Sequence, residues 1–231
     1  MITSLPMYWR AETAAHWQAF WRHVQAAAPD LPDLTPLEAL PDLVTHWRDP
    51  RLAVSMTCSL PFRSLLRGHV TYVGTLDFGL GGPLGHYQSV QIARPGDPAR
   101  ARLARNEAGS QSGWAVAAGG DWAEVIDTGS HAASLAAVAG GQADTAFLDA
   151  VTWRLLQRAD PAAGAVEVVA RTVFTPGLPL ITAKGRDPAP LRQAFAAACA
   201  AFRPAEPAAL GGPLSFVVLD EAAYLDLPLP D

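Results

Sequence analysis

Residues 123–157 read AEVIDTGSHAASLAAVAGGQADTAFLDAVTWRLLQ and carry the pattern that decides the fold class. Two short apolar runs, 123–126 and 143–148, predict buried strands, and residues at helical spacing follow each of them, at 130–139 and 149–157. A glycine pair ends the first helix in the manner of a C-cap. Strands that alternate with helices predict an α/β fold, in which helices cover the faces of a parallel or mixed sheet.

The same alternation continues on both sides of this stretch. Further strands are predicted at residues 2–7, 52–56, 69–76, 87–93, 166–173 and 178–182. Further helices are predicted at residues 10–28, 35–47, 61–66, 112–119 and 190–202. These are too many strands for one compact half, so we expect two lobes. Lobe 1 is predicted to comprise residues 1–87 plus 179–231, and lobe 2 the inserted residues 88–178.

The composition narrows the class of function. Half of the 231 residues are hydrophobic and 17% are charged, which is enough apolar material for a packed core. The net charge of −5 and the lack of a basic run argue against nucleic acid as a partner. The two cysteines, Cys58 and Cys199, have no metal-type spacing, and no cofactor motif is present, so neither a metal nor a cofactor is expected. His16, His23 and His46 lie in predicted helices, where solvent exposure is the default expectation.

Two strand-to-helix turns carry the residues that suit an anion. Residues 106–113 read Asn-Glu-Ala-Gly-Ser-Gln-Ser-Gly and place Ser110, Gln111 and Ser112 where a helix begins. Free N–H groups and the positive end of the helix dipole favour an anion there. In the second turn His131 opens a helix, a position that disfavours its charged form. Simple N-capping by the serines, and a structural histidine, are the competing interpretations.

Two more turns of the same kind complete the set. Asp149 follows a buried strand directly and would cap the next helix, or accept a hydrogen bond from a protonated ligand. Thr57 and Cys58 follow the strand at 52–56. In open α/β sheets, ligands bind beyond the carboxyl ends of the strands. Polar side chains in four such turns therefore predict a site that captures an anion with neutral donors.

At these residues the chain resembles the substrate-binding proteins of phosphate, phosphite and phosphonate ABC transporters, the phosphonate-binding-protein-like group. The matching segments lie in the family's order at residues 5–8, 55–61, 87–90, 106–113, 129–149 and 176–180. The resemblance implies a two-lobed type II periplasmic-binding-protein fold, with a mixed sheet flanked by helices in each lobe and two crossover strands between them. It also implies a solute-binding protein that captures a small oxyanion in an interlobe cleft, as the substrate-binding component of an ABC-type uptake system or a cytoplasmic relative of one.

The resemblance also implies roles for single residues. Ser110, Gln111 and Ser112 correspond to the family's oxyanion cradle, usually Ser-Thr-Ser, with Gln111 in place of the threonine. His131 corresponds to the family's oxyanion histidine. Tyr8 and Tyr87 correspond to two aromatic residues that face the ligand. Asp149 corresponds to an acidic ligand contact, and Thr57 and Cys58 correspond to a loop of lobe 1.

The N-terminal sequence and the family resemblance predict the location and the partners of the protein, and two other functions compete with the solute-binding one. Residues 1–8 lack a secretory signal, which predicts a cytoplasmic protein, or a periplasmic one whose signal has been removed. The expected partners are a small oxyanion and an ABC permease, with the protein itself a monomer. The alternatives are an intracellular ligand sensor of the same fold and an enzyme using Ser–His or Cys–His chemistry. An enzyme triad would require a serine oxygen on one nitrogen of His131 and Asp149 on the other.

Overall fold

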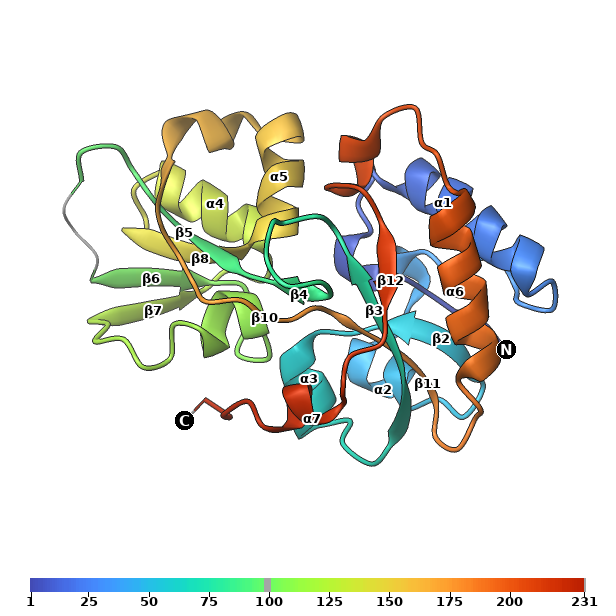
Figure 1. Cartoon of the computed structure of the whole chain (residues 1–231). Coiled ribbons are helices and arrows are strands. Elements are labelled where there is room, and N and C mark those ends of the chain that lie inside the picture. The colour runs from blue at the N-terminus through green and yellow to red at the C-terminus, as the bar shows by residue number, and fades with distance from the viewer. Residues whose placement is uncertain (98–100, 231) are drawn as a thin grey trace. The chain divides into compact units, whose positions relative to one another are not determined.

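The computed structural model describes residues 1–97 and 101–230, and these divide into two compact units. Unit 1 comprises Met1–Gly85 and Pro176–Leu227. Unit 2 comprises His86–Thr175 together with the C-terminal residues from Pro228. The chain passes between the units twice, at strands β4 (His86–Tyr87) and β10 (Thr175–Pro176), which pair with each other. The expected α/β class, with mixed sheets flanked by helices, is confirmed (Figure 1).

Unit 1 is built on a five-stranded mixed sheet. Its order is β1-β2-β11-β3-β12, and the strands are β1 (Ile2–Thr3), β2 (Leu52–Met56), β11 (Pro179–Ala183), β3 (Val70–Asp77) and β12 (Ser215–Val217). Strand β1 runs parallel to β2, and β11 runs antiparallel to both β2 and β3. The carboxyl ends of β1, β2 and β3 therefore lie at one edge of this sheet.

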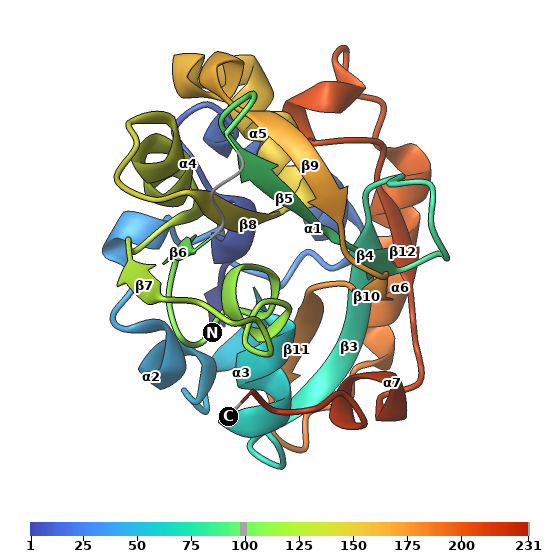
Figure 2. The same ribbon diagram turned by 90° about the vertical axis from the view of Figure 1, so that its left-hand side faces the viewer.

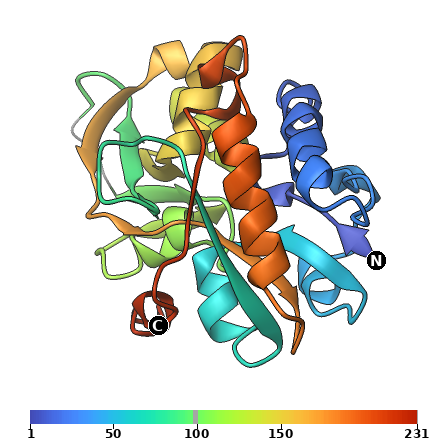
Figure 3. The same cartoon turned by 45° about the vertical axis from the view of Figure 1, so that its right-hand side comes forward.

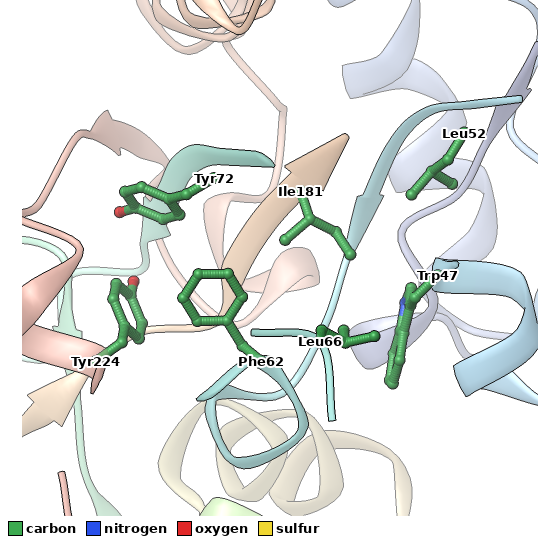
Figure 4. Close-up of a cluster of buried hydrophobic side chains, with 7 residues drawn as sticks. All are labelled: Trp47, Leu52, Phe62, Leu66, Tyr72, Ile181 and Tyr224. Atoms are coloured by element: carbon green, nitrogen blue, oxygen red, sulfur yellow. The ribbon is translucent and has the colours of Figure 1, made fainter. Parts of the chain in front are cut away.

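Helices cover both faces of the unit 1 sheet. They are α1 (Ala14–Ala27), α2 (Leu43–Trp47), α3 (Ser59–Ser64), α6 (Ala189–Ala201) and α7 (Ala222–Leu225), with 3-10 turns at Pro6–Tyr8, Leu37–Ala39 and Pro207–Leu210. Helices α1 and α6 run side by side (Figure 3), and the rings of Trp21 and Phe195 meet between them at 6.2 Å. The other face is covered by α2, α3 and α7, whose apolar side chains form one cluster with the sheet (Figure 4).

A bulge in β3 lets one strand serve both of these cores. Leu180 of β11 pairs with Gly74, but the next residue, Ile181, pairs with Tyr72, so Val73 has no opposite residue. Side chains alternate along a strand, and one extra residue reverses the alternation. Tyr72 consequently packs in the cluster of α2, α3 and α7. Gly74 instead lies against Phe216, where an added Cβ would come within 2.4 Å of the ring.

Three predictions for unit 1 were wrong. The strand predicted over 2–7 ends at Thr3, and a 3-10 turn follows at Pro6–Tyr8. The helix predicted over 35–47 is interrupted: a 3-10 turn ends at Ala39, and α2 begins only at Leu43. Pro41 accounts for the break because it lacks an N–H donor, and Asp42 then caps α2 by accepting a hydrogen bond from Thr45 N at 3.0 Å.

The predicted exposure of His46 was also wrong, since the residue is only 2% exposed. Its Nε2 lies 2.7 Å from the hydroxyl oxygen of Ser4, which is in turn 2.7 Å from the hydroxyl of Ser55. The Ser4 hydroxyl thus gives Nε2 of the buried ring a hydrogen-bond partner in the interior, and Ser55 holds that hydroxyl in place. Burial lowers the pKa of His46.

Unit 2 is built on a second five-stranded mixed sheet (Figure 2). Its order is β7-β6-β8-β5-β9, and the strands are β7 (Glu124–Asp127), β6 (Arg102–Arg105), β8 (Thr145–Asp149), β5 (Ser89–Ala93) and β9 (Glu167–Arg171). Strand β6 is parallel to β7 and β8, whereas β5 is antiparallel to β8 and β9. Helices α4 (His131–Ala139) and α5 (Ala150–Ala159) pack against the sheet, and a 3-10 turn follows at Pro161–Ala165.

Within the described part of the chain, no helix is both long and apolar enough to cross a membrane.

Candidate functional site

One edge of the unit 2 sheet gathers most of the predicted site residues. The parallel strands β6, β7 and β8 end there, at Arg105, Asp127 and Asp149. The antiparallel strand β5 begins there with Ser89, which pairs with Asp149. The turns after these strands therefore meet at a single edge, which is where α/β sheets bind ligands.

The turn after β6, residues 106–115, is called the serine turn below. The predicted helix 112–119 is replaced by one π-helical turn, Gln111–Ala115. Its widening is visible in the hydrogen bond from Ala115 N to Ser110 O, at 2.9 Å, which spans five residues instead of four. Ser110 caps the turn through its hydroxyl oxygen, which accepts from Gly113 N at 2.9 Å. Such single π turns recur at functional sites.

Gly113 of the serine turn lies close against two polar side chains, so a larger residue would have to displace them. A Cβ there would lie 2.0 Å from Oδ1 of Asn106 and 3.2 Å from the hydroxyl oxygen of Ser110. Ser110, Gln111 and Ser112 are all buried. The turn is thus closely packed, with its two serines held inside the unit.

Ser112 contacts His131, the first residue of α4. Oγ of Ser112 lies 3.0 Å from Nε2 of His131. Two backbone hydrogen bonds join the serine turn to the turn that precedes α4. Thr128 N donates to Arg105 O at 2.9 Å, and Gly129 N donates to Asn106 O at 2.8 Å. Backbone hydrogen bonds between the turns therefore fix the distance between the serine and the histidine.

His131 is neutral near pH 7. The residue is half-buried, but its Nδ1 atom is fully buried and has no hydrogen-bond partner among the described residues. Burial disfavours the charged imidazolium and lowers the pKa of His131 from 6.5 to about 4. Buried polar atoms without partners are uncommon in folded proteins, and they occur where a ligand or water completes the bonding.

The lowered pKa predicts acid sensitivity of the free protein. The unfolded chain binds a proton on this ring near pH 6.5, but the folded chain binds it only near pH 4, so stability falls as pH decreases through that window. Between pH 7.5 and 4.5 the loss due to this group should be about 2 kcal/mol. Urea unfolding at both pH values should show that His131→Gln loses less stability than the wild type. Equal losses in the two proteins would contradict the assignment, and comparison with the variant removes the contribution of His46.

Ser89 joins this group, although sequence reasoning did not select it. Its hydroxyl donates to the main-chain oxygen of Ser112 at 3.0 Å, and the residue is 1% exposed. The signal was available in the sequence, since Ser89 lies two residues after Tyr87 in a matching segment, but nothing there distinguished it from an ordinary strand residue. Tyr87 itself is buried in β4.

Asp149 acts as a helix cap in this structure. Its Oδ1 accepts hydrogen bonds from Val151 N at 2.7 Å and Thr152 N at 3.0 Å. No hydrogen bond joins it to Nδ1 of His131, which has no partner within the described residues. The arrangement therefore supplies a serine–histidine pair without the acid of a catalytic triad. A histidine with a pKa of about 4 is also a weak general base at neutral pH.

The other predicted residues belong to unit 1. Tyr8 is buried in the 3-10 turn after β1, and its ring meets Phe78 edge-on at 5.0 Å. Thr57 is buried after β2, with its N–H donating to Pro179 O at 2.9 Å. Cys58 takes the N-cap position of α3 and is half-buried. These residues follow the carboxyl ends of two neighbouring parallel strands, so unit 1 brings them to one edge of its own sheet.

Comparison with known proteins finds a family match for one segment, which spans most of unit 2 and continues into unit 1. Residues 102–211 match the sequence model of a family described as ABC transporter, phosphonate, periplasmic substrate-binding protein. The match covers a little less than half of the chain, and over this segment the chain is similar to that family. It contains the serine turn, His131 and Asp149, whereas Tyr8, Thr57, Cys58 and Tyr87 precede it. Members of this phosphonate-binding family are periplasmic solute-binding proteins of ABC transporters, not enzymes. No curated protein matches the chain.

Solved structures of phosphonate-binding proteins share the fold over nearly the whole chain. A binding protein component of an ABC phosphonate transporter from Pseudomonas aeruginosa aligns with a TM-score of 0.74 at 15% identity, covering 98% of this chain and 83% of that one. PhnD1 from Prochlorococcus marinus in complex with methylphosphonate aligns with a TM-score of 0.73 at 10% identity, covering 97% and 94%.

A third similar structure comes from another bacterium. XAC2383 from Xanthomonas citri, bound to a chloride ion, aligns with a TM-score of 0.68 at 16% identity, covering 96% of this chain and 92% of that one. At these identities the likeness establishes the type II periplasmic-binding-protein fold for this chain.

Proposed function

We propose that this chain is a solute-binding protein that captures a small phosphorus oxyanion, phosphate, phosphite or a phosphonate, for an ABC permease. The observation that carries the proposal is the pair formed by Ser112 and His131, with Oγ and Nε2 3.0 Å apart and a buried Nδ1 that has no partner among the described residues. A ligand oxygen would complete the hydrogen bonding of this pair. The family of the segment and the methylphosphonate bound to PhnD1 support the choice of ligand class.

The chemistry of the pair suits an oxyanion. If the Ser112 hydroxyl donates to Nε2, the neutral ring carries its proton on Nδ1, which can then donate to a ligand oxygen. Hydrogen bonds to a charged acceptor are roughly twice as strong as neutral ones. A neutral histidine also avoids burying a cation when the ligand is absent. The empty state is therefore stable, and the bound state gains hydrogen bonds to an anion.

The remaining residues have subsidiary roles in this proposal. Ser110 keeps the serine turn closed, and Gln111 takes the place of the family's usual threonine, so its amide replaces a hydroxyl in the cradle. Tyr8, Thr57, Cys58 and Tyr87 stay as proposed contacts on the strength of the family resemblance alone. Asp149 is proposed to hold the start of α5 in place and not to act as an acid or base, because its Oδ1 accepts two backbone hydrogen bonds.

A thermal-shift panel tests the proposal. Phosphate, phosphite, methylphosphonate, 2-aminoethylphosphonate and sulfate would each be added to the purified chain. A ligand at about 100 times its Kd stabilises the folded state by about 2.7 kcal/mol, which should raise Tm by several degrees for a chain of this size. We expect such a shift with at least one phosphorus oxyanion and none with sulfate. The proposed ligand class would be refuted by an unchanged Tm throughout the panel.

A further inference from the structure

An arginine–aspartate pair lies directly beside the two turns that form the proposed site. Arg105 is the last residue of β6 and Asp127 the last of β7, and they are opposite each other in the parallel ladder. Nε of Arg105 lies 2.6 Å from Oδ1 of Asp127, and Nη2 lies 3.2 Å from Oδ2. This is a bidentate pairing, in which the planar guanidinium is fixed in orientation as well as in position. The guanidinium also holds the pKa of Asp127 below its usual range.

The same guanidinium supports the serine turn. Its central carbon lies over the ring of Trp114, 4.3 Å from the ring centroid. Trp114 follows Ser112 and Gly113 within the π-helical turn. The main-chain oxygen of Arg105 meanwhile accepts two hydrogen bonds from Thr128, one from N and one from Oγ1, both at 2.9 Å. One residue therefore contacts the turn that carries Ser112 and the turn that leads to His131.

We infer that Arg105 is a positioning residue of the oxyanion site, which acts through Trp114 and Asp127 without contacting the ligand. This inference rests on the proposed function. The side chain of Arg105 is 18% exposed, and its charge is already shared between a carboxylate and an aromatic face. Preorganising the serine turn in its binding geometry improves affinity because less ordering remains to be done when the anion binds.

The role depends on the shape of arginine more than on its charge. A lysine keeps the positive charge but has no planar fork to pair bidentately and stack on a ring at the same time. The carboxylate of Asp127 is 63% exposed, and exposed ion pairs contribute little to global stability. Changes at this pair should therefore alter ligand affinity with little change in the Tm of the free protein.

The test is calorimetric titration of methylphosphonate and phosphate into wild type, Arg105→Lys, Arg105→Gln and Asp127→Asn. We expect all three variants to bind about fivefold to tenfold more weakly than wild type, with Arg105→Lys close to Arg105→Gln. Hydrogen exchange of the free proteins adds a readout that needs no ligand: the amides of residues 111–115 should exchange faster in the Arg105 variants. The matched control is Arg51→Lys, since Arg51 makes a bidentate pair with Asp49 in unit 1, and it should bind as wild type does.

Each contrary outcome has a distinct meaning. Wild-type affinity in Arg105→Lys, with loss only in Arg105→Gln, would show that charge matters and overturn the positioning role while leaving the proposed function intact. Tighter binding by Asp127→Asn would likewise overturn it, because it would reveal a cation that the aspartate restrains. If the wild type binds no phosphorus oxyanion of the thermal-shift panel, the proposed function fails and this inference fails with it.

Discussion

Replacing His131 with alanine should weaken oxyanion binding by about 2–3 kcal/mol, or roughly 30- to 150-fold in Kd. The variant removes the ring whose Nε2 contacts Ser112 and whose buried Nδ1 has no partner among the described residues. A hydrogen bond to a charged ligand is lost, and the hydroxyl of Ser112 loses its partner as well. Calorimetric titration with whichever oxyanion binds the wild type measures the change directly.

The controls separate a role in binding from a role in folding. Tm of the free variant reports any loss of stability, and His69→Ala, which removes an exposed histidine of unit 1, should leave affinity unchanged. Ser112→Ala and the double variant complete a mutant cycle. Coupling between the two positions is expected because their side chains are in contact. Wild-type affinity in His131→Ala would remove this residue from the site.

Replacing Phe62 with alanine should destabilise the protein by about 3–5 kcal/mol, the usual cost of deleting a buried phenylalanine ring. Phe62 of α3 is 2% exposed and lies among the other side chains of its cluster in Figure 4. Its ring centroid is 5.4 Å from that of Tyr224 and 5.8 Å from that of Tyr72. The cluster joins α2, α3 and α7 to the sheet, so the cavity would open where several elements meet.

Urea unfolding followed by circular dichroism measures this loss. Leu65→Ala is the matched control, because Leu65 is three residues further on and 48% exposed, and it should cost well under about 1 kcal/mol. A loss for Phe62→Ala as small as that of the control would mean that this face of the sheet does not hold unit 1 together.

The α/β class was predictable from the sequence because it depends on the periodic spacing of apolar residues along the chain. Apolar residues there have a spacing that fits only one kind of element. This holds for the strands at 52–56 and 145–149 and for the helices at 131–139 and 150–159. Boundaries that depend on backbone chemistry were harder. Pro41 stops a helix that the apolar pattern would have continued to Trp47. The short strand β12 and helix α7 gave no periodic signal and were missed.

The candidate site was predictable by residue type and not by contact. Ser112 and His131 were selected because each follows a strand, but their 3.0 Å contact depends on the order β7-β6-β8, which places the two turns side by side. The roles of Ser89 and Arg105 arise from contacts across strands and turns, which sequence spacing does not encode. The burial of His46 has the same origin, since its hydrogen-bond partner Ser4 is 42 residues away in the sequence.

The most direct test of the central claim is a crystal structure of the protein grown with methylphosphonate. We expect the phosphonate group at the serine turn, with an oxygen within hydrogen-bond distance of His131 and another near Ser112. Ligand bound elsewhere in the molecule, with Ser112 and His131 still facing only each other, would contradict it.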